Sequence, residues 1–148
     1  MERMPLVVNI KDYYQLVDHT GDLGIIVWGN DLAQLFCHAG LAFFDIITDL
    51  SRVQTREEKE ILVEGQDLEQ LMVNWLGELL YLFDTRGLLF HELRMLELSN
   101  NGLKALGHGE PFDQERHIIN TIIKAATYHQ MKVAEGEKGW QARIIFDL

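Results

Sequence analysis

Residues 31–47 read DLAQLFCHAGLAFFDII, and this stretch decides the fold. Its apolar residues recur every three or four positions, which is the period of an amphipathic α-helix. Asp31 is a good N-cap, and Gln34 lies three positions later, as in a capping box. The stretch therefore predicts a helix with one apolar face, formed by Leu32, Leu35, Phe36, Ala39, Phe43, Ile46 and Ile47.

A second stretch, residues 67–83, has the same punctuation. Asp67 is the predicted N-cap, Gln70 follows three positions later, and Gly87 is placed to end the helix in a left-handed conformation. Met72 and Trp75 lie on its apolar face and are expected in the core. The openings DLAQL and DLEQL are alike, but nothing around them repeats. They indicate shared capping chemistry and not an internal repeat.

The rest of the chain is dominated by strand patterns. Residues 51–60 are polar and predict an exposed connection, and Asn100-Asn101-Gly102 predicts a tight hairpin turn. Runs rich in β-branched and aromatic residues predict strands at 13–18, 24–28, 61–64, 91–98, 103–107, 122–133 and 140–148. The sum is an α+β fold, with two amphipathic helices packed on a mixed, largely antiparallel β-sheet. No linker divides the chain, so a single domain is predicted.

The composition bounds the class of protein and its partners. Of 148 residues, 47% are hydrophobic and 24% are charged, which is the balance of a soluble globular domain. With 13 basic and 23 acidic residues the net charge is −10. Such a chain is repelled by phosphate backbones, so strong direct nucleic-acid binding is not expected. No run approaches the roughly 18 apolar residues of a membrane span, so no membrane association is expected.

The chain has a single cysteine, Cys37, which excludes an internal disulfide and any multi-cysteine metal site. A reducing, cytoplasmic location follows most simply, and the N-terminus has no signal-peptide pattern. Cys37 lies beside the apolar face of the first helix. We expect a small buried side chain there in preference to a redox group.

Acidic residues gather in the turn DHTGD, residues 18–22, and Asp147 lies in the last predicted strand, before Leu148. Two interpretations of the turn remain open. Aspartate and glycine are typical of tight turns, where the carboxylate bonds its own backbone. Alternatively, carboxylates and carbonyls without a thiolate suit a hard cation such as Ca²⁺ or Mg²⁺.

The histidines give little support for other chemistry. His19, His91, His108, His117 and His129 are scattered, and no pair has the i, i+4 spacing of a helical zinc site. The sixth, His38, is predicted on the exposed side of the first helix. Neither a zinc site nor a Ser-His-Asp triad is therefore predicted.

Two further features could carry function. Residues 107–110 read GHGE, but Pro111 follows in place of a helix, so a hairpin-end loop is favoured over a phosphate-binding loop. Lys124 lies in a mostly apolar stretch, where a cation needs solvent or an anionic partner. It is either an edge lysine that discourages aggregation or a group that meets an anion.

Taken together, these motifs resemble the archease family. The resemblance covers residues 13–148 and leaves residues 1–12 as an N-terminal extension. No single motif is long, but their order and spacing are specific. The matching motifs are YxxxDHTGDxGI at 14–25, WG at 28–29, WLxELLYL at 75–82, GE at 109–110, KAxTYH at 124–129, GW at 139–140 and RIIxD at 143–147. The chain departs from the family at Gly21, where alanine is more usual, and at Leu148, where isoleucine or valine is common.

The resemblance implies a function. Archeases are non-catalytic activators of the RtcB-type RNA ligase, which joins RNA 3′-phosphate or 2′,3′-cyclic-phosphate ends to 5′-hydroxyl ends in tRNA splicing and RNA repair. They promote ligase guanylylation and multiple turnover. The expected partner is therefore such a ligase, and the protein itself is not expected to be an enzyme. The alternative is a metal-dependent hydrolase or phosphoesterase that uses the same carboxylates.

The resemblance also implies site residues. A divalent metal ion, with Ca²⁺ favoured and Mg²⁺ or Mn²⁺ as alternatives, would be held by the side chains of Asp22 and Asp147 and by the backbone oxygen of Leu148. The family's functional lysine corresponds to Lys124. Asp18 and His19 match the signature and are expected to support the site without binding the metal.

Overall fold

The two helices begin and end where their caps predict. The computed structural model describes residues 9–17 and 21–148. Helix α1 spans Leu32–Ile47 and helix α2 spans Leu68–Arg86. Asp31 accepts the backbone N–H of Gln34 at 2.7 Å, and Asp67 accepts that of Gln70 at 2.8 Å. Gly87 follows α2 with φ +69°, a left-handed conformation that glycine adopts without a Cβ clash.

The strands of the described residues form two antiparallel sheets and not one mixed sheet. The predicted α+β class is confirmed, but the pairing of the strands divides them. The four-stranded sheet has the order β1 (Tyr14–Val17), β2 (Leu23–Gly29), β7 (Gly139–Asp147), β6 (Ala125–Gly136). The three-stranded sheet has the order β3 (Glu57–Glu64), β5 (Gly102–Pro111), β4 (Leu88–Ser99). Short 3₁₀ helices lie at Ile10–Asp12 (η1) and Leu50–Arg52 (η2).

Several strand predictions differ from the structure, and three of the differences bear on the site or on the packing of the strands. The exposed connection predicted at residues 51–60 ends earlier, because Glu57–Glu60 already pair with β5. The strand predicted from residue 122 begins at Ala125, so Lys124 precedes β6. The residues GHGE at 107–110 are not a loop but the second half of β5. A Cβ at Gly109 would come within 1.8 Å of the carbonyl oxygen of Leu89, so glycine permits the close approach of β4.

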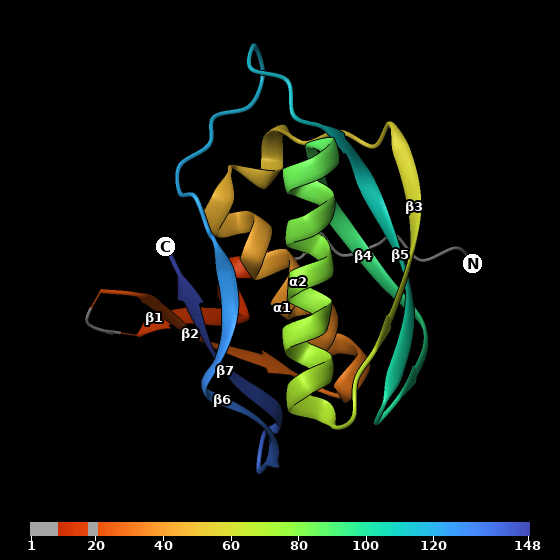
Figure 1. Ribbon diagram of the computed structural model, residues 1–148, viewed down its shortest axis with the longest axis vertical. Helices are drawn as coiled ribbons and strands as arrows, with labels where there is room; N and C mark the ends of the chain where they lie inside the picture. The colour runs from red at the N-terminus through yellow and green to blue at the C-terminus, as the bar shows by residue number, and fades with distance from the viewer. Residues whose placement is uncertain (1–8, 18–20) are drawn as a thin grey trace.

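The core lies where the helices meet the sheets. Helix α1 packs on β2 and β4, and α2 packs on β3 and β6. In Figure 1, α2 lies in front, with β6 on one side and β3 on the other. The indole of Trp75 is fully buried and donates to the carbonyl of Phe36 at 2.8 Å, which joins the two helices. No helix in the described ranges combines the length and apolar character that crossing a membrane requires.

The prediction that His38 is exposed is wrong. Its side chain is buried, its Nδ1 lies 2.7 Å from the carbonyl oxygen of Trp28, and its ring stacks on Tyr13 at a centroid distance of 4.1 Å. Tyr13, which covers the ring of His38, directly follows η1, and η1 packs on α1. Burial lowers the pKa of the His38 imidazole, since the charged form loses its hydration.

Candidate functional site

The sheet register brings Asp22, Asp147 and Lys124 to one end of the four-stranded sheet, where β2 begins and β7 ends. This end is called the site edge. Leu23 of β2 pairs with Phe146 of β7, so Asp22 is the next residue beside Asp147. On the other side of β7, Ala125 of β6 pairs with Asp147. In Figure 1 the C-terminus accordingly lies beside the start of β6. Residues separated by more than 100 positions in the sequence thus converge at the end of β7.

Lys124 is fixed to this edge through its backbone. Its N–H donates to the carbonyl of Asp147 at 2.8 Å, one residue before β6 begins. The neighbouring Ile123 is buried and anchors the segment, whereas the Lys124 side chain is exposed. A lysine held in this way keeps its ammonium group available to an anion from another molecule. The arrangement differs from the predicted mid-strand position, because Lys124 precedes β6.

The oxygen donors at this edge suit a hard cation. Asp147 and Leu148 are exposed, and Asp22 is half-buried. Two carboxylates and main-chain oxygens, without sulfur or imidazole, form the donor class that Ca²⁺, Mg²⁺ and Mn²⁺ prefer. The part of the chain that the structure describes contains no group of three or more His, Cys, Asp or Glu side chains that could hold a metal. Asp18 and His19 lie outside the described residues.

The connection that leads into Lys124, residues 112–124, is secured by a buried ionic cluster. Glu110, at the end of β5, has no exposed surface. The guanidinium of Arg116 donates to both carboxylate oxygens of Glu110, at 2.9 Å from Nη1 to Oε2. The backbone N–H of Gln54 donates to Oε2 of the same carboxylate at 2.7 Å. Nε2 of His117 lies 3.0 Å from the same carboxylate. Residues 112–124 form the long loop that rises beyond α2 in Figure 1.

The hydrogen bonds of His117 define its tautomer. Nδ1 accepts the backbone N–H of Asp113 at 2.9 Å, so it carries no proton. Nε2 therefore holds the proton and can donate to Glu110 and to the carbonyl of Arg52, at 3.0 and 3.1 Å. The bond from Arg116, then the backbone N–H of Gln54 and His117, lower the pKa of Glu110 to about 2.

Two more hydrogen bonds hold the middle of the connection. The Thr48 hydroxyl donates to the carbonyl of Ile118 at 2.7 Å, and the N–H of Asn120 donates to the carbonyl of Ile47 at 2.7 Å. The end of α1 therefore fixes the chain a few residues before Lys124. The sequence analysis predicted neither this cluster nor these bonds. One signal was available: small or apolar residues alternate from Leu103 and Ala105 through the glycines that follow, a strand pattern that extends to Glu110.

Cys37 lies beside the core, as predicted, but it is less buried than predicted. The thiol is half-buried, and burial raises its pKa to about 11. It is therefore protonated at neutral pH and a poor nucleophile.

Comparison with known proteins places the chain in a family. The sequence model of the Archease protein family (MTH1598/TM1083) matches residues 14–148. The chain belongs to the archease family. Protein archease from Methanosarcina acetivorans is 35% identical over 139 residues, which cover 91% of this chain and 95% of that protein. The family predicted from the ordered motifs is confirmed.

Solved structures agree with this assignment. The solution structure of Methanobacterium thermoautotrophicum protein 1598 superimposes with a TM-score of 0.77 and is 32% identical, covering 91% of this chain and 98% of that one. A crystal structure of an archease from Thermotoga maritima, described as a possible chaperone, has a TM-score of 0.63 at 18% identity. It covers 100% of this chain and 98% of its own, and at this identity it supports the fold.

Proposed function

We propose that this archease-family protein is a non-catalytic activator of an RtcB-type RNA ligase. In this role it promotes guanylylation of the ligase and multiple turnover during tRNA splicing and RNA repair in the cytoplasm. The observation that carries the proposal is the register of β2, β7 and β6, which gathers Asp22, Asp147 and Lys124 at one exposed edge. The family match, over residues 14–148, includes all three positions.

The proposed metal ligands are the carboxylates of Asp22 and Asp147 and the backbone oxygen of Leu148. A bound divalent cation would supply a fixed positive charge with coordination positions left for a partner's oxygen ligand. Ca²⁺ is the favoured ion, and Mg²⁺ and Mn²⁺ are alternatives. The chain's own part is to hold two carboxylates side by side at an edge where another molecule can reach them.

Lys124 has a separate role in the proposal. A cation does not bind a metal ion, so its ammonium group is assigned to an anion on the ligase, such as a carboxylate or a phosphate. Lysine serves such a contact as a point charge, without the two-pronged geometry of arginine. The charge of the whole chain fits this picture, since a protein at −10 associates with a basic protein surface more readily than with RNA.

The deciding experiment is ligase turnover with and without this protein. Added to its cognate RtcB-type ligase with GTP and Mn²⁺, the protein should raise both the guanylylation rate and the number of ligation cycles per enzyme, and it should ligate no RNA alone. Equal turnover in its absence, across several metal and nucleotide conditions, would contradict the proposal. Release of phosphate from a phosphomonoester or phosphodiester by the protein alone would instead favour a metal-dependent hydrolase.

Metal binding should stabilise the folded state. With free ion at a hundred times Kd, the free energy of unfolding should rise by about 2.7 kcal/mol. Asp22→Ala and Asp147→Ala should abolish this rise, and removal of Leu148 should reduce it. Asp84→Ala, which removes an exposed carboxylate on α2, is the matched control and should respond like the wild type. A wild-type melting temperature unchanged by Ca²⁺, Mg²⁺ and Mn²⁺ would contradict the site.

A further inference from the structure

Strand β3 is an edge strand of the three-stranded sheet, because among the described residues it pairs with β5 alone. The ladder fixes the direction of its backbone groups. The N–H of Gly65 donates to the carbonyl of Asn101 at 3.1 Å, so odd-numbered residues of β3 bond to β5. The N–H and C=O groups of Glu60, Leu62 and Glu64 therefore point away from the sheet. One of them has a partner already, since the Asn74 side chain donates to the carbonyl of Glu64 at 2.8 Å.

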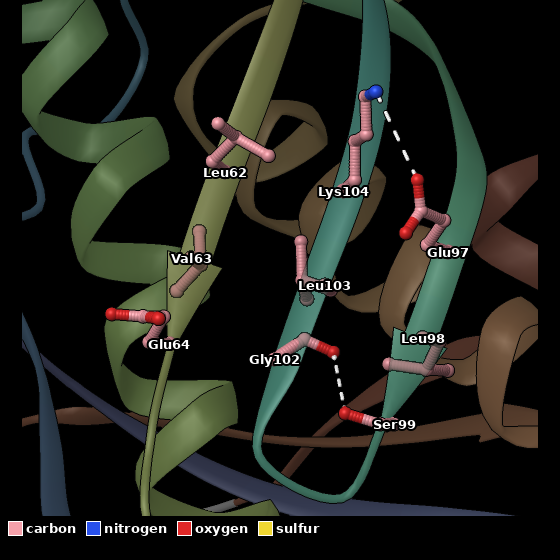
Figure 2. A pocket seen from close by; sticks show the side chains of 9 residues that line it. All are labelled: Leu62, Val63, Glu64, Glu97, Leu98, Ser99, Gly102, Leu103 and Lys104. Atoms are coloured by element: carbon pink, nitrogen blue, oxygen red, sulfur yellow. Dashed lines mark hydrogen bonds and ion pairs between the residues drawn. The ribbon is translucent and has the colours of Figure 1, made fainter.

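Two hollows flank this edge. One, of about 500 Å³, lies between β3, α2 and the start of β6; its lining includes the apolar Val73, Leu80 and Ala126 and the polar Asn74 and Glu78. Gly77 lines it too, and a Cβ added there would meet nothing within 4 Å. The other, of about 770 Å³, lies over the three-stranded sheet; its lining residues are drawn in Figure 2. Both are lined by residues 62–64, so the β3 edge separates them.

The edge is acidic. Strand β3 reads EEKEILVE, with four glutamates and one lysine. Outward-facing Glu60 and Glu64 flank Leu62, whose side chain is 66% exposed. Lys104 lies 3.6 Å from Glu60 and 3.8 Å from Glu97, so it offsets part of this charge. Within the described ranges the Glu64 carboxylate has no ion pair.

The charge pattern selects the occupant. Two copies of β3 paired antiparallel about Leu62 would place Glu60 of one copy opposite Glu64 of the other, and like charges directly opposite destabilise a pair of strands. The same positions attract lysine or arginine. A strand added beside β3 would also send alternate side chains to opposite faces of the sheet. One set would meet Glu60 and Glu64, and the other would meet the apolar residues that α2 and β6 contribute to the hollow.

We propose that the β3 edge binds an extended segment of a partner protein as an added strand, in which basic residues alternate with aliphatic residues. The basic side chains lie over the three-stranded sheet, and the aliphatic side chains enter the hollow beside α2. Main-chain hydrogen bonds to Leu62 and Glu60 provide the attachment, as in other cases of strand addition. The hollow reaches Ala125, which pairs with Asp147, so this site adjoins the proposed metal and lysine site, but strand addition is tested without a ligase.

The test uses a ten-residue peptide of alternating lysine and valine as the probe. Hydrogen exchange of the full chain, followed residue by residue by NMR, reports strand addition directly. At saturating peptide the amides of Glu60, Leu62 and Glu64 should exchange at least about tenfold more slowly, since they acquire acceptors. The amides of Ile61 and Val63, already bonded to β5, should not change. Binding by charge alone would not slow the exchange of alternate β3 amides, and that result would overturn the proposal.

A control peptide and two pairs of variants define the contacts. The same peptide with every amide N-methylated keeps its charge but cannot donate, and it should bind at least about tenfold more weakly. Gly77→Leu should block the hollow, whereas Gly77→Ala, which also removes a helix glycine, should bind like the wild type. The double variant Glu60→Gln/Glu64→Gln should bind more weakly than Glu115→Gln/Glu137→Gln, which has the same net charge.

Three results would overturn the proposal. Equal binding of the N-methylated peptide would show that the carbonyl groups of the β3 edge accept no hydrogen bonds from the added strand. Protection of the even-numbered β3 amides that grows with protein concentration, without peptide, would show that a second copy is the occupant. Protection of those amides in the isolated protein at every concentration would show that the chain covers its own edge.

Discussion

Replacing Glu110 by alanine is expected to lower the free energy of unfolding by about 3–5 kcal/mol, the usual cost of removing one partner from a buried ion pair. The Glu110 carboxylate has no exposed surface and is enclosed by its own partners, although Arg116 reaches solvent. Its loss would leave the N–H of Gln54 without its acceptor, deprive that guanidinium of its two-oxygen partner, and leave the Nε2 proton of His117 with the carbonyl of Arg52 alone. Urea unfolding at pH 7 measures the effect.

Glu97→Ala is the matched control, because this glutamate is 73% exposed and its contact with Lys104 is 3.8 Å long. It should cost about 1 kcal/mol or less. Equal midpoints for the two variants would contradict the structural role of Glu110.

The pH dependence gives a second measurement of the same cluster. The pKa of Glu110 is about 2 in the folded state and near 4.5 when unfolded. Between these values the unfolded state binds more protons, so the stabilisation is complete above pH 4.5 and disappears as the pH falls toward 2. Glu110→Gln removes this titration, so the difference in stability between wild type and variant should shrink over that range.

The helices could be predicted because their signals are local. Asp31 with Gln34, and Asp67 with Gln70, satisfy backbone groups within one turn of the same helix. Gly87 likewise ends α2 through its own conformation. No distant residue is needed to interpret these positions, and the structure places all of them as predicted.

The sheets and their glycines required information that is not local. Nothing in a strand's own residues says that β3 pairs with β5 and not with β6, so the division into two sheets was missed. Gly109 was interpreted as a loop residue, but it is glycine because the backbone of Leu89 lies against it. His38 was placed in solvent because its cover, Tyr13, comes from a segment far from it in the sequence.

The candidate site lies between these cases. A metal bound by both Asp22 and Asp147 required β2 and β7 to be neighbours, and the register confirms that they are. The position of Lys124 depends on a backbone bond to Asp147 that no sequence pattern reveals. The Lys124 side chain is exposed, which agrees with both interpretations of it. Experiment must decide whether this lysine prevents aggregation or binds an anion on another molecule.

Lys124→Ala is expected to reduce activation of the ligase by roughly ten- to a hundredfold while leaving fold and metal affinity intact. A charged hydrogen bond contributes about 1.5–3 kcal/mol, which corresponds to that range if the bond forms in the rate-limiting step. The backbone N–H that bonds Asp147 is kept in alanine, so the edge itself should not move. The guanylylation rate of the ligase and the melting temperature of the variant are the two measurements.

Lys132→Ala is the matched control, because Lys132 is exposed on β6, the strand that follows Lys124, and pairs with Arg143, away from Asp147. It removes the same charge and should leave activation unchanged. Lys124→Arg keeps a cation at the edge and should restore part of the activity, which a residue that only limits aggregation would not predict. Full activation by Lys124→Ala with a normal melting temperature would contradict the functional role. Unchanged activation with lowered solubility would identify Lys124 as an edge residue that prevents self-association.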